Sequence, residues 1–478
     1  MKPCSAQAGF GRADFTPEQP VIMSGFAARA GASQGIHDRL EARCMLALSG
    51  GPPVAVLTFD VIGIDSGLCA AARETVVTAV NELLHSTRAV WDGATPLTPD
   101  RVAVACTHTH SGPATLRSAR LGEVDPAVLD MIVAAAHQAA TAAVRDIKPG
   151  WFRYGSARVD GVAVNRRVPD GPVDSELQML GFWPAVPFTP GAAAQGDSPS
   201  PGIGGPSGLL ATFALHPVVL GPDNLLLTRD YVGYVLDDLE SSLPGCVPMW
   251  ATGFAGQINH GHLATASSGA PSDRRSFAEA GRVGRRLAEV VKEAVARAQV
   301  PPDPGEISAA SLHVDLAYLP PRRDLRELAT EWRRELVELG TGPGAATHDH
   351  FRRAVLPLMA AWADDWATPW SEARVAPARR VELQSLGIEG VSLVFCPGEP
   401  FVEYALALKR NASGPVMPIA YANDAPGYLP TAAAHAEGGY EVDSAYMFYG
   451  EPGVFGPESE GVLGSCLEQV AREVRRPG

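Results

Sequence analysis

Val102-Ala103-Val104-Ala105-Cys106-Thr107-His108-Thr109-His110-Ser111-Gly112-Pro113 joins an apolar run to two histidines one residue apart. The run 102–106 is typical of a buried strand. Side chains at positions i and i+2 of an extended chain share a face, so His108 and His110 are expected to reach one pocket at the strand's end. One imidazole can then bind a metal while the other handles protons, although a hydrogen-bonded structural pair would show the same pattern.

Two further ligand candidates follow other predicted strands. His216 comes directly after the apolar run 209–215, and Glu399 lies in Cys396-Pro397-Gly398-Glu399-Pro400 after the run 391–396. Each has an ordinary alternative, a core histidine and a solvated turn glutamate. Together, two histidines and one carboxylate form the set of a catalytic zinc site, which keeps one coordination position open for water.

Composition narrows the class of protein. The chain has 478 residues, of which 46% are hydrophobic and 19% charged, as in an ordinary globular protein with a large core. The net charge of −14 argues against nucleic acids and anionic membranes as partners, because both are negatively charged. We therefore expect a small or neutral substrate.

The cysteines and the amino terminus suggest a location. The seven cysteines are odd in number and scattered, which indicates thiols in a reducing compartment and not a disulfide scaffold. Residues 1–8 contain no apolar run of signal-peptide length, and no later stretch offers about 18 uninterrupted apolar residues. The expected protein is cytoplasmic and has no integral membrane segment.

The order of elements predicts an α/β (α+β) fold of mixed β-sheets flanked by helices. We expect one large catalytic domain over residues 1–478, with a loop insertion at 184–208 and a helical insertion at 322–366 that could act as a lid. The predicted strands are 42–48, 54–59, 102–106, 152–155, 177–182, 209–215, 307–318, 381–386 and 391–396, and the predicted helices are 68–84, 126–147 and 275–299.

Read with their neighbours, these residues resemble the neutral/alkaline (non-lysosomal) ceramidase family over almost the whole chain. A block from Ala422-Asn423-Asp424 to Gly439-Tyr440-Glu441 is especially specific, because its tyrosines Tyr428 and Tyr440 keep the family's spacing of twelve. The other motifs, in the family's order, are GFGRAD (9–14), MSGF (23–26), GIHDRLEAR (35–43), THTHSGP (107–113), VNRR (164–167), PVD (172–174), HP (216–217), RDYVGY (229–234) and GEPF (398–401).

The resemblance implies a zinc ion held by His108, His216, Glu399 and Tyr428, with water completing the coordination sphere. It places His110, Arg166 and Tyr440 where the family keeps its proton-handling and carbonyl-orienting groups. These parts suit amide hydrolysis, since zinc lowers the pKa of bound water toward ~7 and an imidazole of pKa about 6.5 transfers protons both ways. Arg166 and Tyr440 can donate to the developing oxyanion, a contribution of ~3 kcal/mol per donor.

One run departs from the family. Where the family reads NAGDVSPN, residues 254–261 read FAGQINHG, so an acidic residue and a serine are replaced. This change places Asn259 and His260 in the substrate pocket and puts recognition of the ceramide headgroup in doubt. The secretion signal and carboxy-terminal immunoglobulin-like domain of familiar ceramidases are not expected in this chain.

Some residues have two open interpretations. The pairs His260/His262 and His348/His350 could indicate a second metal, but 340–351 is polar and glycine-rich and predicts a loop. Three aspartates beside strands could orient the ligating histidines or act as turn residues and helix caps: Asp60, Asp230 and Asp424.

The expected function is that of a zinc-dependent hydrolase of a linear N-acyl amide. Ceramide is the first candidate substrate, because it is the substrate of the family that the chain resembles. The altered run 254–261 favours an alternative, an amidase acting on another N-acyl amine in specialised metabolism. A non-catalytic relative that binds metal or lipid is the alternative from another class. Retention of His110, Arg166 and Tyr440 argues against it, because binding alone needs no proton transfer.

Overall fold

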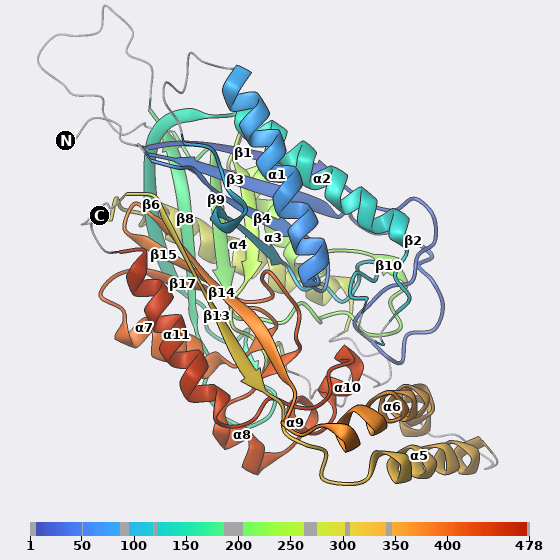
Figure 1. The fold of residues 1–478 in the computed structure, drawn as a ribbon. Helices are drawn as coiled ribbons and strands as arrows, with labels where there is room; N and C mark the ends of the chain where they lie inside the picture. Colours follow the sequence, from blue (N-terminus) through green and yellow to red (C-terminus); the bar gives the residue numbers. More distant parts are fainter. Residues whose placement is uncertain are drawn as a thin grey trace, which may run out of the picture.

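Two β-sheets pack face to face, and helices cover their outer faces (Figure 1). The computed structural model describes residues 6–49, 51–86, 95–117, 120, 122–185, 204–261, 275–301, 306–340 and 347–475. The predicted class, mixed sheets flanked by helices, is confirmed. Most of the predicted loop insertion, residues 186–203, lies outside the described residues.

The larger sheet has eight strands and mixes parallel with antiparallel pairs. The strand that precedes His108 lies at one edge, and the strand that precedes His216 lies next to the other edge. In spatial order the strands are β11 (Val247–Thr252), β9 (Gly208–Phe213), β8 (Glu176–Pro184), β6 (Lys148–Arg158), β1 (Ala6–Asp14), β3 (Glu41–Leu48), β4 (Val54–Phe59) and β5 (Val102–Cys106).

This sheet curls until its two edges meet. The Thr252 hydroxyl at the end of β11 donates to the Thr107 carbonyl beyond β5, at 2.7 Å. Residues 420–421 hydrogen-bond to both edges: the Ala420 N–H donates to Thr252 O at 2.9 Å, and Tyr421 O accepts from Cys106 N–H at 3.1 Å. The curl therefore brings the ends of β5 and β9 to one place.

The smaller sheet has four strands and fills the concave side of the first. Its strands are β13 (Ser308–Ala317), β14 (Ala378–Ile388), β15 (Val391–Phe395) and β17 (Val416–Ile419). Apolar side chains of the two sheets form one core that excludes water, as the alternation of strand side chains requires. Its members include Met45, Leu180, Leu210, Leu386 and Phe395, each at most 1% exposed.

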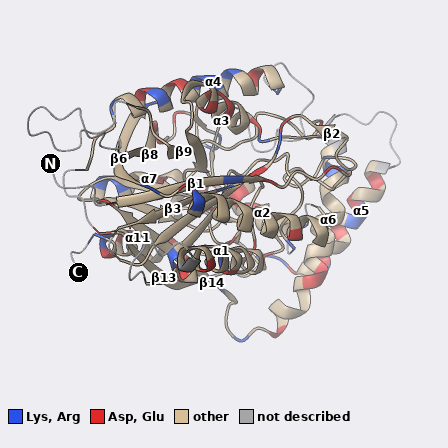
Figure 2. Ribbon diagram, turned by 90° about the horizontal axis from the view of Figure 1, so that it is seen from above, with Lys and Arg blue, Asp and Glu red and all other residues tan. Residues whose placement is uncertain are grey.

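In the part of the chain that the structure describes, six helices cover the outer faces, and Figure 2 shows bands of charged residues on helices such as α4, while the strands are mostly uncharged. The first two pack against β1, β3 and β5, the next two against β6, β8 and β11, and the last two against the smaller sheet. In that order they are α1 (Ser66–Ser86), α2 (Pro126–Arg145), α3 (Tyr231–Ser242), α4 (Phe277–Ala296), α7 (Val402–Asn411) and α11 (Ser459–Glu473).

In the region predicted as a helical insertion, the structure has the paired helices α5 (Leu325–Gly340) and α6 (Thr347–Glu372). The prediction of a loop over 340–351 is wrong for its last residues, since α6 already includes His348 and His350. Residues 347–350 form the first turn of α6, directly before Phe351, which packs on the hairpin's core.

Short elements shape the loops at the meeting edges. Two-residue strands pair as β2 (Gly35–Ile36) with β10 (Leu226–Leu227), β7 (Val164–Asn165) with β12 (Ile258–Asn259), and β16 (Glu399–Pro400) with β18 (Tyr428–Leu429). The remaining helices are η1 (Pro99–Arg101), α8 (Ala432–Glu437), α9 (Tyr440–Asp443) and α10 (Ala445–Tyr449).

Helix α2 lies unusually close to strand β1. A Cβ on Gly9 would lie 1.9 Å from the Ala143 carbonyl oxygen, and a Cβ on Gly11 would lie 2.2 Å from Ala139 O. These glycines of the GFGRAD motif therefore permit the contact. Helix α2 is also long and apolar enough to cross a membrane by composition, and half of it is buried against the fold.

Gly9→Ala is expected to destabilise the protein by about 1–3 kcal/mol, because the new methyl group must displace the α2 backbone. Urea unfolding followed by circular dichroism measures the change. Gly464→Ala in α11 is the control, since a Cβ there meets nothing within 4 Å and the free energy of unfolding should stay equal or rise. Equal stability of Gly9→Ala and the parent would contradict the close-approach argument.

Candidate metal centre

The first two histidines lie in the loop after β5 and not on an extended strand. The strand ends at Cys106, and His108 adopts a left-handed backbone with φ of 66°. Strand alternation was expected to place both side chains together, and this explanation is wrong because neither histidine lies on the strand. The outcome is nevertheless as expected, because the Nε2 atoms of His108 and His110 lie 3.3 Å apart.

Each histidine of the cluster points its Nδ1 at a backbone carbonyl. His108 Nδ1 lies 2.5 Å from Ile62 O, and His216 Nδ1 lies 2.8 Å from Ala255 O. His110 Nδ1 lies 3.1 Å from the carbonyl of Gly25. A carbonyl can only accept, so this network assigns the proton of each neutral ring to Nδ1. All three Nε2 atoms are then left with lone pairs.

These lone pairs converge on one another and on a carboxylate. His108 Nε2 lies 3.1 Å from His216 Nε2, and Glu399 Oε2 lies 3.1 Å from His216 Nε2 and 3.6 Å from His108 Nε2. Glu399 Oε2 is buried and makes no hydrogen bond within the described residues. Two ligands about 2.0–2.1 Å from a tetrahedral zinc are about 3.3 Å apart, so these atoms fit a metal ion.

Burial sets the charges of the cluster. Removal from water lowers the pKa of His108 and of His216 to about 3, which keeps both imidazoles neutral as ligands must be. Burial also lowers the pKa of His110 well below its ordinary value and raises the pKa of Glu399. Among the described residues no arginine or lysine forms an ion pair with Glu399, although the charge of Arg166 acts from further away to lower the pKa of the carboxyl group; a bound metal would supply a close cation.

Glu399 is oriented from two sides. The ladder of β16 with β18 sets it opposite Tyr428, and the Tyr449 hydroxyl hydrogen-bonds its Oε1. Tyr421 lies beside the cluster, with its ring stacked on His108 at 3.7 Å between centroids. The sequence reasoning missed Tyr449 and Tyr421, because each lies in an apolar segment that carries no catalytic pattern.

Arg166 occupies the rim of the cluster. Its Nη2 donates to Tyr428 OH at 3.0 Å and to Gly256 O at 2.8 Å, while its Nε pairs with Glu441 Oε1 at 2.8 Å. The Tyr440 ring lies 5.8 Å from that of Tyr428. Glu441, nearly fully buried, fixes the guanidinium and was not predicted as a site residue, although it closes the motif around Tyr440.

The run 254–261, whose sequence differs from that of the family, contacts His216 and Glu399. Its Ala255 carbonyl holds His216, and Gly256 allows close approach, since a Cβ there would lie 2.6 Å from Glu399 O. Gln257 faces away, because its Nε2 donates to Glu403 and its Oε1 accepts from the Val402 N–H at the start of α7. The replaced acidic position therefore has a structural role in this chain.

The two residues expected in a substrate pocket follow Gln257. Asn259 is fully buried at the end of β12, and its Oδ1 accepts from the Gly261 N–H at 2.9 Å. His260 is half-buried at the next position. The β7–β12 ladder places both near Arg166, whose N–H donates to Gln257 O. Their contact with substrate stays a prediction.

The aspartates do not orient the histidines. Asp230 caps α3, Asp60 accepts from the Glu41 N–H, and Asp424 pairs with Arg379. The expectation that they support the imidazoles is wrong, and the alternative of caps and turn residues holds, because backbone carbonyls hold the rings.

A second metal gains no support from the other histidine pairs. Among the described residues, one group of three or more potential metal-binding side chains is found, formed by His108, His110 and His216. His262 lies outside the described residues, and the side chains of His348 and His350 are not described.

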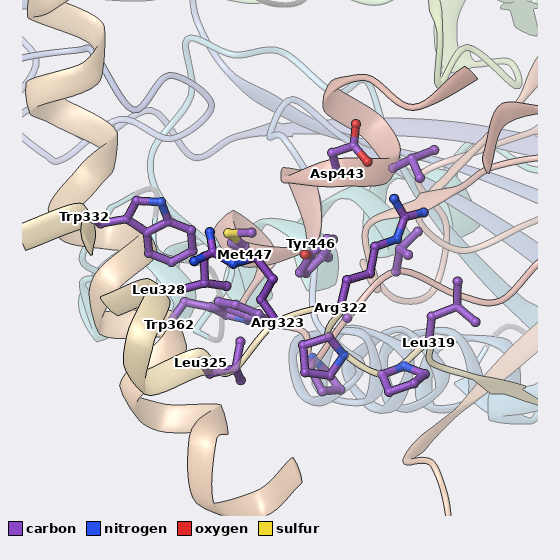
Figure 3. Close-up of a pocket in the computed structure, with 16 residues that line it drawn as sticks. Leu319, Arg322, Arg323, Leu325, Leu328, Trp332, Trp362, Asp443, Tyr446 and Met447 are labelled. Carbon is purple, nitrogen blue, oxygen red and sulfur yellow. The ribbon is translucent and has the colours of Figure 1, made fainter. Parts of the chain in front are cut away.

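A separate apolar pocket of about 240 Å³ lies on the α5–α6 side (Figure 3). Trp332, Trp362, Tyr446 and Met447 form much of its wall, and Arg322 and Arg323 flank it. None of the cluster's residues lines this pocket. It is therefore distinct from the candidate metal centre.

An α/β fold with buried imidazoles and a carboxylate at its meeting sheet edges defines a class of candidate metalloprotein. Residues 7–169 match the family model described as neutral/alkaline non-lysosomal ceramidase, N-terminal. The structure is similar to that of neutral ceramidase from Pseudomonas aeruginosa, with a TM-score of 0.69, 19% identity, and coverage of 100% of this chain and 76% of that chain.

A ceramidase complexed with C2 gives a similar match, with a TM-score of 0.67, 18% identity, and coverage of 99% of this chain and 76% of that chain. The resemblance to the ceramidase family is confirmed for residues 7–169 by the family model, and the chain as a whole has the fold of these proteins.

The metal-free protein is expected to lose stability as pH falls from about 6.5 toward about 3. Burial lowers the pKa of His108 and His216 to about 3, so the unfolded chain takes up protons first. Urea midpoints of chelator-treated protein at several pH values measure the slope. His216→Gln should reduce it, while His137→Gln, at an exposed position of α2, should not. An unchanged slope in His216→Gln would contradict the assignment.

Proposed function

We propose that this protein is a zinc-dependent hydrolase of a linear N-acyl amide. His108, His216, Glu399 and Tyr428 would hold the metal. One observation carries the proposal: the Nε2 lone pairs of buried, neutral imidazoles converge on a carboxylate oxygen that has no hydrogen bond among the described residues. The ceramidase family match supports a hydrolase.

A bound zinc ion would supply Lewis acidity and lower the pKa of a water molecule to about 7. His110 is suited to move the proton, because it is the less buried member of the histidine cluster and its Nε2 carries a lone pair. Burial holds its pKa well below the ordinary value, which disfavours uptake of the proton at Nε2 and favours its release to the leaving amine.

Arg166 and Tyr440 would stabilise the negative charge that develops on the carbonyl oxygen. Nε and Nη2 of Arg166 are engaged by Glu441, Gly256 and Tyr428, which fixes the guanidinium plane. Nη1 has no hydrogen bond among the described residues and would be the donor for substrate. The Tyr440 hydroxyl is neutral, since burial raises its pKa above the ordinary value. A preorganised donor of this kind contributes about 3 kcal/mol.

Ceramide is the first candidate substrate, because the family and the similar structures carry that activity in their names. Another N-acyl amine is the alternative. It is favoured by the altered run through Asn259 and His260, which the β7–β12 ladder places near Arg166.

Purified protein is expected to contain zinc in a 1:1 ratio, and His108→Ala should lose it together with hydrolysis. Tyr440→Phe should keep the zinc and lose about 10²–10³-fold in kcat, because only a transition-state donor is removed. Elemental analysis and amine release from a panel of ceramide and short N-acyl amines measure both. His137→Ala, at an exposed position, is the control.

The panel also separates the alternatives. Release from short N-acyl amines without release from ceramide would support the non-ceramide amidase. Zinc without hydrolysis of any amide would refute the hydrolase and support a binding protein. Activity that survives loss of zinc in His108→Ala would refute the metal dependence.

A further inference from the structure

The side chain that orients Glu399 is followed directly by a segment that helix α6 holds. Tyr449 ends α10, and its hydroxyl hydrogen-bonds Glu399 Oε1. Gly450 then turns the chain with a left-handed φ of 72°, and residues 450–452 run along α6. The Gly450 N–H donates to Met447 O at 3.3 Å and the Glu451 N–H donates to Tyr446 O at 3.0 Å, so this segment is tied to the short helix that ends in Tyr449.

Three tryptophan side chains of helix α6 hydrogen-bond to the backbone of this segment. Trp362, Trp366 and Trp370 are four residues apart and so share one face of the helix. We name them the tryptophan face. Their Nε1 atoms donate to three consecutive carbonyls: Trp366 to Gly450 at 3.2 Å, Trp362 to Glu451 at 2.7 Å and Trp370 to Pro452 at 2.8 Å.

The segment has another anchor that holds a side chain and not the backbone. The Glu451 carboxylate pairs with Arg379 at 3.0 Å and accepts from the Tyr318 hydroxyl. Arg379 lies in β14 and Tyr318 directly follows β13, so both tie Glu451 to the smaller sheet. The backbone carbonyls of 450–452 are held by α6, a helix of the insertion.

We infer that the tryptophan face positions Glu399 for metal binding, acting through Tyr449. With Oε1 held by Tyr449, the carboxylate turns Oε2 toward the imidazoles, 3.1 Å from His216 Nε2. The inference rests on the proposed metal site. The indoles are positioning residues, because none of them is part of the metal-ligand cluster, and the α5–α6 hairpin thereby contributes to zinc affinity.

The test is zinc affinity of chelator-treated protein, measured by competition with a chromogenic chelator. Tyr449→Phe and the double variant Trp366→Phe/Trp370→Phe should each weaken zinc binding about 10–100-fold, as loss of a partner that orients a ligand does. Trp332→Phe is the matched control. It changes an indole of the same apolar cluster that makes no hydrogen bond among the described residues, and it should leave the affinity unchanged.

A double-mutant cycle shows whether the indoles act through Tyr449. In the Tyr449→Phe background the tryptophan changes should have no further effect, since the link to Glu399 is already cut. An equal loss in both backgrounds, or no loss in either, would overturn the inference. If the double variant does not fold, Trp370→Phe alone, at the half-buried end of the tryptophan face, replaces it in the cycle.

The outcome is independent of turnover. Zinc affinity that follows the cycle supports the positioning role even if the protein hydrolyses no amide, in which case only the proposed hydrolase fails. A parent chain that binds no zinc would overturn the metal site and the positioning role together.

Discussion

Three backbone carbonyls hold the Nδ1 protons of three buried histidines, and the candidate site depends on this arrangement. Because each proton is fixed on Nδ1, the Nε2 lone pairs of His108, His110 and His216 face one another with no hydrogen between them. A cation resolves such a repulsive arrangement, and the adjacent Glu399 oxygen adds the negative charge that a divalent ion needs.

The scaffold's main contribution is the curl of the larger sheet. His108 and His216 follow strands near opposite edges of that sheet, and a flat sheet would keep them far apart. The contact of Thr252 with Thr107 and the bonds of residues 420–421 to both edges close the gap. The site therefore lies where edges meet, and its geometry depends on backbone pairing far from the ligands.

The altered run 254–261 and the α5–α6 hairpin both hold other segments of the chain in place. Gln257 replaces an acidic residue of the family, yet it bonds to α7 and not to the site. The hairpin carries a pocket of its own and also holds the segment after Tyr449. Gln257 thus holds the start of α7, and the hairpin holds the segment that follows Tyr449.

The sequence alone predicted the strand 102–106, the long helices, the helical insertion and the residue types of a metal site, because periodicity and strand-end motifs are local properties. The single domain, the cytoplasmic location and the roles of the site residues stay predictions. The tertiary structure decided which nitrogen of each histidine is free and brought Tyr449 and Glu441 to the site. Their partners lie tens to hundreds of residues away along the chain, and no local pattern encodes contacts created by the curl of a sheet.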